Sequence, residues 1–258
     1  MKQYKTEVTL VTVNLHPEGK GYLVYGDERI EEDTLLPRVT SITDILDKFG
    51  LRNYKMEQAL EFVGDTLKEN RNVDIDALVE AAKVAADAKR DDAANFGVEA
   101  HALLEQLAVD PMIAVPDKFL PVVEAWKECI EGLVIKETES KVYYSIGGIQ
   151  FAGTVDMVAS DGEHLYIYDY KTGKNVYAEH ALQVAAYVMA YEFTNKLRDG
   201  TIKGAYIIKL PKEESDKTLI KGLDNLEMHK EAFLNLCCIK QWKSNRKKWL
   251  KFKPVVRV

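Results

Sequence analysis

GTVDMVASDGEHLYIYDYK, residues 153–171, is typical of two β-strands joined by a tight turn. Asp161-Gly162 is a strong signal for a two-residue hairpin loop. In that register Asp156 lies diagonal to Asp169 on one face of the sheet, about 7 to 8 Å away. Side chains alternate along a strand, so Lys171 lies on the same face. The segment therefore predicts two carboxylates and an ammonium group close together.

This grouping of charges predicts a metal site. Neighbouring carboxylates repel one another and attract a divalent cation, and oxygen ligands of this kind suit Mg²⁺ or Mn²⁺. A bound ion activates water and stabilises charge on a phosphoryl group, while Lys171 would orient the nucleophile or offset developing negative charge. The alternative is an exposed ion pair of Asp169 and Lys171. That alternative is weakened by apolar neighbours on the same face, namely Val158, Leu165 and Ile167.

Two helical segments carry polar pairs with a spacing of four residues. His101 and Glu105 form one pair, and Gln183 and Tyr187 form the other. Residues at this spacing share a helix face, with Cβ atoms about 5 to 6 Å apart, and His with Glu can ligate or position a metal. Taken alone, the first pair is more often a surface contact and the second is more often ordinary packing of an Ala-rich helix.

The order of these patterns resembles the RecB-like branch of the PD-(D/E)XK nuclease superfamily. GxxxHxxxE, GTxD, DYK followed by TGK, and QxxxY begin at Gly97, Gly153, Asp169 and Gln183, respectively. Similar proteins include the mitochondrial genome maintenance exonuclease and the CRISPR adaptation nucleases. The similarity covers roughly residues 95–195, and residues 36–42 (LPRVTSI) are more weakly similar to a segment of some members.

The resemblance implies a role for each matched residue. The implied ligands of Mg²⁺ or Mn²⁺ are His101, Asp156, Asp169 and the backbone carbonyl of Tyr170. Lys171 matches the catalytic lysine. Glu105, Gln183 and Tyr187 match positions that support catalysis by contacting the metal shell or the DNA.

The same resemblance implies a DNA exonuclease that acts on single-stranded or duplex ends in recombination or repair, with a phage role as one example. A structure-specific endonuclease on the same fold remains an alternative, as does a non-catalytic nucleic-acid-binding protein. Some relatives hold an iron–sulfur cluster with four cysteines, but Cys129, Cys237 and Cys238 fit neither that number nor that spacing. There is no Walker A motif, so DNA unwinding would require a separate helicase or recombination protein.

The last part of the chain predicts a contact with nucleic acid. Residues 240–258 carry a charge of +8, whereas the whole chain has −6 and the remainder therefore −14. A basic end on an acidic body indicates a polyanionic partner. The residues expected to contact DNA are Lys243, Arg246, Lys247, Lys248 and Trp249. A solvated helix whose aromatic residues pack on the core is an equal alternative.

The remaining sequence predicts a mixed α/β protein with a restriction-endonuclease-like core: a mixed central sheet flanked by helices. A hairpin (5–14, 22–25) and helices make an accessory segment over residues 1–72, and the nuclease core covers 73–258. Ser41 is expected to cap a short helix that ends near Gly50. The further expected helices are 54–69, 76–108 (either one helix or two broken near Gly97), 117–132, 178–197 and 226–250, and the expected strands are 135–144, 149–159, 164–171, 203–210 and 217–221.

Composition predicts a cytoplasmic protein that does not enter a membrane. No stretch approaches the roughly 18 consecutive apolar residues of a membrane span. The first ten residues, MKQYKTEVTL, lack the apolar run of a signal peptide.

Overall fold

A five-stranded mixed sheet forms the centre of the computed structural model, which describes residues 11–31, 34–46 and 49–245. The strands are β3 (Val134–Ile146), β4 (Ile149–Ser160), β5 (Leu165–Lys171), β6 (Ile202–Lys209) and β7 (Leu219–Gly222), in that spatial order. β5 and β6 are parallel, and all other neighbours are antiparallel. α5 (Ala178–Thr194) connects the parallel pair, as such a pair requires. The predicted strand and helix order is confirmed.

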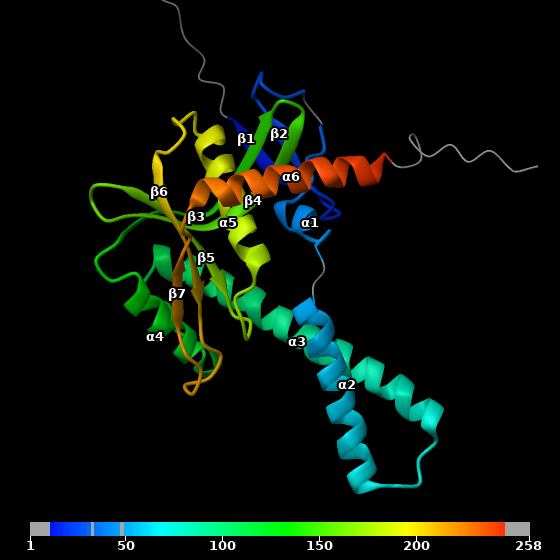
Figure 1. Cartoon of the computed structure of the whole chain (residues 1–258). Helices are drawn as coiled ribbons and strands as arrows, with labels where there is room; N and C mark the ends of the chain where they lie inside the picture. Colours follow the sequence, from blue (N-terminus) through cyan, green and yellow to red (C-terminus); the bar gives the residue numbers. More distant parts are fainter. Residues whose placement is uncertain (1–10, 32–33, 47–48, 246–258) are drawn as a thin grey trace, which may run out of the picture.

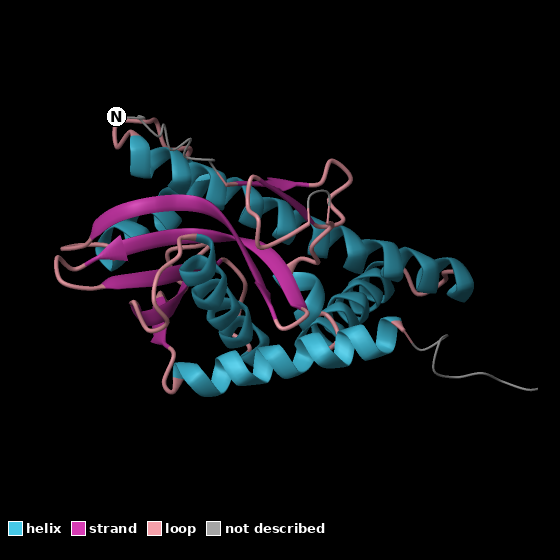
Figure 2. Cartoon of the chain, turned by 90° about the horizontal axis from the view of Figure 1, so that it is seen from above, coloured by secondary structure: helices cyan, strands magenta, loops and turns pink. Residues whose placement is uncertain are grey.

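Helices cover both faces of this sheet (Figures 1 and 2). α5 and α6 (Leu226–Ser244) pack on one face together with the short α1 (Val39–Thr43). α3 (Ile75–Val109) and α4 (Leu120–Cys129), the latter preceded by the 3₁₀ turn η1 (Asp117–Phe119), pack on the other face. Each face therefore has its own apolar core, and the predicted fold class is confirmed.

The N-terminal hairpin shares a third core with the central sheet. β1 (Thr12–Leu15) and β2 (Tyr22–Tyr25) form a separate antiparallel pair. The second strand is where the sequence predicts it, whereas residues 5–10 of the predicted first strand lie outside the described residues. Apolar residues of the hairpin pack against the β3–β4 edge; this cluster includes Val13, Tyr22, Val24, Leu36, Tyr143 and Ala152. The hairpin is thus attached to the sheet by burial of apolar surface.

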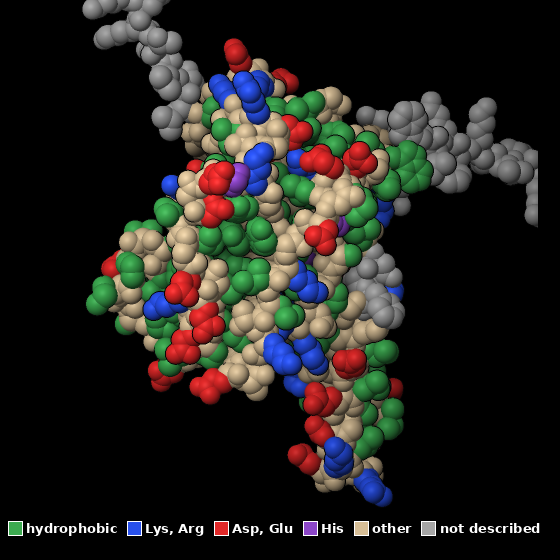
Figure 3. Space-filling view, turned by 60° about the vertical axis from the view of Figure 1, so that its left-hand side comes forward, with side chains coloured by type: hydrophobic (Ala, Val, Ile, Leu, Met, Phe, Trp, Pro, Cys, Tyr) green, Lys and Arg blue, Asp and Glu red, His purple; other side chains and the backbone are tan. Residues whose placement is uncertain are grey.

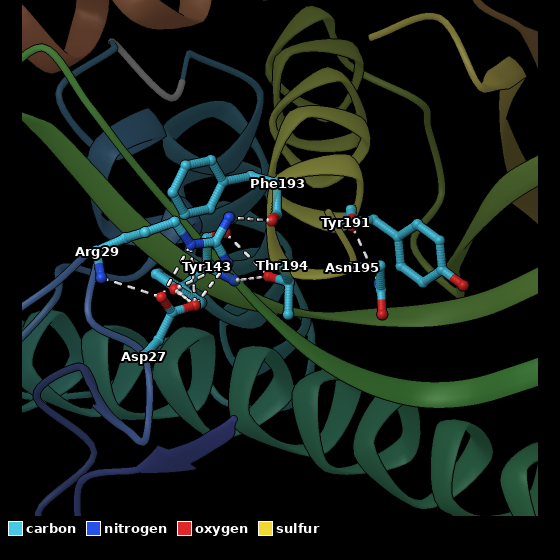
Figure 4. Close-up of polar contacts among 7 residues, drawn as sticks. All are labelled: Asp27, Arg29, Tyr143, Tyr191, Phe193, Thr194 and Asn195. Carbon is cyan, nitrogen blue, oxygen red and sulfur yellow. Dashed lines mark hydrogen bonds and ion pairs between the residues drawn. The ribbon is translucent and has the colours of Figure 1, made fainter. Parts of the chain in front are cut away.

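A polar network also fastens the hairpin (Figure 4). Arg29 donates from Nε to Asp27 Oδ1 over 2.9 Å and from Nη1 to the Phe193 carbonyl, also over 2.9 Å. Its guanidinium carbon lies 4.1 Å from the centre of the Phe193 ring, and the Tyr143 hydroxyl donates to Asp27. The Arg29 guanidinium holds the pKa of Asp27 well below its usual range. This carboxylate is buried with all of its charge compensated.

α2 (Phe49–Glu69) and the first half of α3 form an arm that projects from the body (Figure 1). α3 continues through Gly97 as one helix, which decides between the two predicted alternatives. Asp74 caps α3 by accepting from the Ala77 N–H over 2.8 Å. Hydrophobic side chains line one edge of the arm in Figure 3. The predicted division at residue 72 lies in the turn between the two helices, and it stays a prediction.

Two local predictions are wrong. Ser41 does not cap α1: Arg38 is the N-cap, and the Ser41 hydroxyl donates back to the Arg38 carbonyl over 2.7 Å. Serine hydroxyls inside a helix commonly form such bonds to a preceding carbonyl. α1 also ends at Thr43 and does not extend to Gly50.

The second error concerns the β4–β5 turn. Ser160 pairs with Leu165, so the loop has four residues instead of two. Asp161 Oδ1 accepts the N–H groups of Glu163 and His164 over 2.9 and 2.8 Å, which makes the longer turn stable. The register is shifted by two residues, and an even shift leaves the side chains of the paired residues, 157–160 and 165–168, on their predicted faces. Among the described helices, none is long and apolar enough to cross a membrane.

Candidate metal centre

A cavity of about 690 Å³ opens beside the middle of β4 and the C-terminal end of β5. α3 forms one wall, and the hairpin with residues 38–40 contributes the opposite side. The predicted site residues that line it are His101, Glu105, Asp156, Tyr170, Lys171 and Tyr187. Asp169 and Gln183 are not among the lining residues; they lie behind the cavity, between β5 and α5.

His101 and Asp156 meet at the floor of the cavity. His101 Nδ1 is 3.3 Å from Asp156 Oδ1, although the two residues are on α3 and β4. The other oxygen of Asp156 accepts the Tyr170 N–H over 2.7 Å, so the β5 backbone orients this carboxylate. Burial lowers the pKa of His101, but the neighbouring Asp156 carboxylate outweighs this effect and the net shift is upward.

Glu139 joins this pair and was not predicted from the sequence. One ligand atom from each of His101, Glu139 and Asp156 lies within 4.8 Å of the others. The neighbouring pairs Thr138–Met157 and Ser140–Val155 place Glu139 across from Asp156. Burial raises the pKa of Glu139 to about 7, and Asp156 adds to the effect. An imidazole and two carboxylates at this spacing form a donor set for a divalent cation.

The backbone is irregular where these residues meet. Glu139 has a φ of 48°, a left-handed conformation that residues other than glycine rarely adopt. Val155 and Val158 both pack on the α5 side of the sheet, although strict alternation would place them on opposite faces. Met157 packs on the α3 side, so the alternation breaks next to Asp156. Strained backbone of this kind is concentrated at functional sites.

Asp169 and Lys171 form a buried pair next to this cluster. Asp169 is 1% exposed, and its Oδ2 is 2.6 Å from Lys171 Nζ. This contact is a close ion pair whose angle departs from that of an ideal hydrogen bond. Burial raises the pKa of Asp169, and Lys171 opposes the shift. A carboxylate buried this deeply is costly unless positive charge compensates it, and Lys171 supplies that charge here.

A family model of the PD-(D/E)XK nuclease superfamily matches residues 58–252, about three quarters of the chain. The chain belongs to this superfamily. Two solved structures are distantly similar: SSO0001 (13% identity, 56% of this chain, 70% of that chain, TM-score 0.30) and the alkaline exonuclease LHK-Exo from Laribacter hongkongensis (12%, 57%, 82%, TM-score 0.29). No curated protein matches the chain.

PD-(D/E)XK nucleases use a divalent metal, and the residues of this chain fit one. His101, Glu139 and Asp156 offer a ring nitrogen and carboxylate oxygens, which are suitable ligands for such an ion. Asp169 is buried next to this set, and its carboxylate forms an ion pair with Lys171 over 2.6 Å. The three described cysteines do not form a cluster: Cys237 is buried, Cys129 half-buried and Cys238 exposed.

Residues of sequence patterns that lie far apart in the chain are in contact in the structure. Gln183 Nε2 donates to the Tyr187 hydroxyl over 2.8 Å and approaches Asp169 Oδ1 at 3.4 Å. A Cβ on Gly153 would lie 2.6 Å from the Tyr187 ring, so the GTxD pattern requires glycine there. A Cβ on Gly97 would lie 3.0 Å from the Thr172 hydroxyl oxygen. Gln183 and Tyr187 therefore support Asp169 and β4.

The remaining predicted residues lie further from this centre. Glu105 is exposed at the cavity wall, one helical turn beyond His101, and is outside the three-residue cluster. Lys243 is exposed near the end of α6. The other predicted DNA contacts lie outside the described residues: Arg246, Lys247, Lys248 and Trp249.

Proposed function

We propose that this protein is a Mg²⁺- or Mn²⁺-dependent deoxyribonuclease that acts as an exonuclease on DNA ends. The observation that carries the proposal is the convergence, at one cavity of a PD-(D/E)XK nuclease, of a His–Glu–Asp cluster with Lys171, whose partner Asp169 is buried behind the cavity. The choice of DNA and of exonuclease action rests on family resemblance, together with the distant likeness to an alkaline exonuclease, which carries no weight alone.

The metal would be held by His101, Asp156 and Asp169, with the Tyr170 carbonyl as a backbone ligand. Glu139 is added to this set because its carboxylate lies beside His101 and Asp156. When bound, a divalent ion supplies an acidified water and positive charge next to the phosphate. The crowded carboxylates would repel one another less once a divalent cation is bound. Such binding would explain why three of them lie close together.

The chain's own residues would prepare the reaction. Lys171 lines the cavity with its side chain 18% exposed, so its ammonium group can reach a phosphate from a fixed position. There it would hold the attacking water or offset charge that develops on the phosphate, both of which favour the transition state. The Tyr170 N–H holds Asp156, and Gln183 together with Tyr187 holds Asp169.

Two alternatives remain. A structure-specific endonuclease would use the same residues and would differ in the substrate that it admits. A non-catalytic nucleic-acid-binding protein would have no use for the buried Asp169–Lys171 ion pair or for the left-handed Glu139, which each cost stability. These two features favour an enzyme.

Digestion of labelled DNA tests the proposal. Linear DNA labelled at either end, single strands and covalently closed circles would be incubated with Mg²⁺ or Mn²⁺. We expect release of short products from linear ends, intact circles and no activity in Asp156→Asn. Lys83→Ala, which removes an exposed lysine of the arm, should remain active. Cleavage of circles would favour the endonuclease, and a folded protein inactive on every DNA would reject the nuclease.

The proposal extends to the basic end of the chain as a DNA contact. Lys243, Arg246, Lys247 and Lys248 would bind the phosphate backbone, and Trp249 would stack on bases. Any helicase or recombination protein that acts with the nuclease would be a separate protein. Replacing the four cations by Ala should weaken DNA binding and reduce its dependence on salt, because each phosphate contact releases counterions. Unchanged affinity with an unchanged salt slope would show that this end does not bind DNA.

A further inference from the structure

We infer that two copies of this chain associate through α2 of the arm, whose outer face carries a short coiled-coil seam. Five residues form this seam, alternately three and four positions apart: Asn53, Met56, Leu60, Val63 and Leu67. This spacing is that of the a and d positions of a heptad repeat. The metal centre lies outside the seam, so pairing of two copies can be tested without any measurement of cleavage.

The seam points away from the helix on which α2 packs. Lys55 Nζ is 2.7 Å from Asp87 Oδ1, and Glu61 Oε2 is 3.0 Å from Lys89 Nζ. Lys55 and Glu61 therefore flank the side of α2 that faces α3. An α-helix turns by about 100° per residue, which places the seam on the opposite side. The arm thus directs the seam outward, where another helix can reach it.

The apolar side chains of the seam lack cover from the rest of the described chain. Met56 and Leu60 are 58% and 63% exposed, and Val63 and Leu67 are partly exposed. None of these four belongs to the three apolar cores of the described residues. Hydrophobic side chains along one edge of the arm are visible in Figure 3. A continuous apolar stripe bordered by polar residues marks an interaction surface, whereas isolated apolar residues do not.

The polar residues of the heptads favour a parallel pair of identical helices. Asn53 occupies an a position, where a single asparagine fixes the register and the number of strands. Arg52 is then at position g and Glu57 at position e of the following heptad, and both are exposed. In a parallel pair, these two positions face each other across the seam. Arg52 of each copy would therefore meet the partner's Glu57, so the surface is complementary to itself in charge.

Gly64 is a further sign of a close partner. It lies inside α2, where glycine costs stability relative to alanine, and a Cβ added to it would meet nothing within 4 Å. The single chain therefore gives no reason for glycine at this position. In the parallel register, Gly64 at position e faces the partner's Ala59 at position g. Two small residues at this level would let the paired helices approach closely.

The oligomeric state of the full chain tests the seam. Sedimentation velocity over about 1 to 100 μM should show a dimer that dissociates on dilution. Leu60→Glu should raise the dimer Kd on the order of a hundredfold, because a symmetric dimer loses two buried leucines. Val84→Glu is the control, since Val84 is a 69% exposed valine of α3 outside the seam. A wild-type monomer or trimer, or equal Kd values for the two folded variants, would overturn the inference.

Exchange of the flanking charges tests the parallel register. Arg52→Glu and Glu57→Arg each put like charges opposite one another in a homodimer, so each should weaken it by roughly three- to tenfold. An equimolar mixture of the two variants should recover the wild-type affinity, because a mixed dimer again pairs opposite charges at both contacts. A loss of an intrachain contact would not recover on mixing. Failure of the mixture to dimerise better than either variant alone would therefore overturn the pairing.

Discussion

Asp27 and Asp169 are both aspartates with almost fully buried side chains, yet their surroundings differ. Asp27 accepts hydrogen bonds from Arg29 and Tyr143, and the Arg29 guanidinium lowers its pKa. Asp169 has one close partner, the Lys171 ammonium at 2.6 Å, and a long contact with Gln183 at 3.4 Å, and burial raises its pKa. Complete satisfaction indicates a structural carboxylate, whereas an incomplete set indicates a group kept for a ligand. This difference distinguishes the polar network that fastens the N-terminal hairpin from the metal centre.

Substitutions of Lys171 and of Arg29, the cations that pair with these two aspartates, should differ most in their effect on the rate of cleavage. Lys171→Ala should slow single-turnover cleavage on the order of a hundredfold or more, roughly 3 kcal/mol, because a positioned charge near the phosphate is lost. Arg29→Ala should leave the chemical step near wild type once folded, because Arg29 contacts Asp27, Tyr143 and Phe193 instead of the cavity. Lys171→Ala that cleaves within a few fold of wild type would make Lys171 a structural partner of Asp169.

Of the two buried aspartates, the fully hydrogen-bonded Asp27 should contribute more to the free energy of unfolding. Asp27→Asn removes a hydrogen-bonded charge, and we expect a loss of about 2 kcal/mol in the free energy of unfolding, measured in urea. The folded-state pKa of Asp27 lies below its unfolded value, so its contribution is complete above about pH 4 and is lost as the pH falls through the folded pKa. The difference between wild type and Asp27→Asn should therefore shrink in acid. A difference that is constant down to pH 2 would contradict the assigned ionic network.

Glu139, whose backbone is strained, should behave in the opposite way: its removal should reduce activity without reducing stability. Glu139→Gly relieves a left-handed φ of 48°, so the folded protein should be as stable as wild type or more stable by up to about 1 kcal/mol. Metal-dependent cleavage should nevertheless be reduced, because a carboxylate next to His101 and Asp156 is gone. Glu137→Gly is the control: it is a neighbouring exposed residue of β3 outside the three-residue cluster. Full activity in Glu139→Gly would remove Glu139 from the site.

Much of this arrangement could be predicted from local patterns. The period of two between about residues 135 and 171 identified three central strands, and the spacing of His101, Asp156 and Asp169 matched a known order of motifs. In the paired part of β4 and β5, an even register shift preserved the predicted faces despite the wrong turn length. Sequence periodicity is sufficient where the structure is regular.

The residues that escaped prediction lie where the structure is irregular. Glu139 stands in a charged stretch, KETESK, that gives no sign of a left-handed backbone, because glutamate rarely adopts that conformation. Its position beside His101 depends on the packing of α3 against the sheet, which no local pattern encodes. The same holds for Asp27, whose partner Tyr143 is more than one hundred residues away in the sequence.

Metal-dependent stabilisation tests the contrast between the two regions most directly. The thermal midpoint would be measured with and without Mn²⁺ for wild type, for Asp27→Asn and for the double variant Asp156→Ala/Asp169→Ala. A ligand that binds only the folded state at a hundred times its Kd adds about 2.7 kcal/mol. We predict a clear rise for wild type, an equal rise from a lower starting midpoint for Asp27→Asn, and none for the double variant. The same rise in the double variant, or no rise in wild type, would contradict the assignment of these carboxylates to a metal centre.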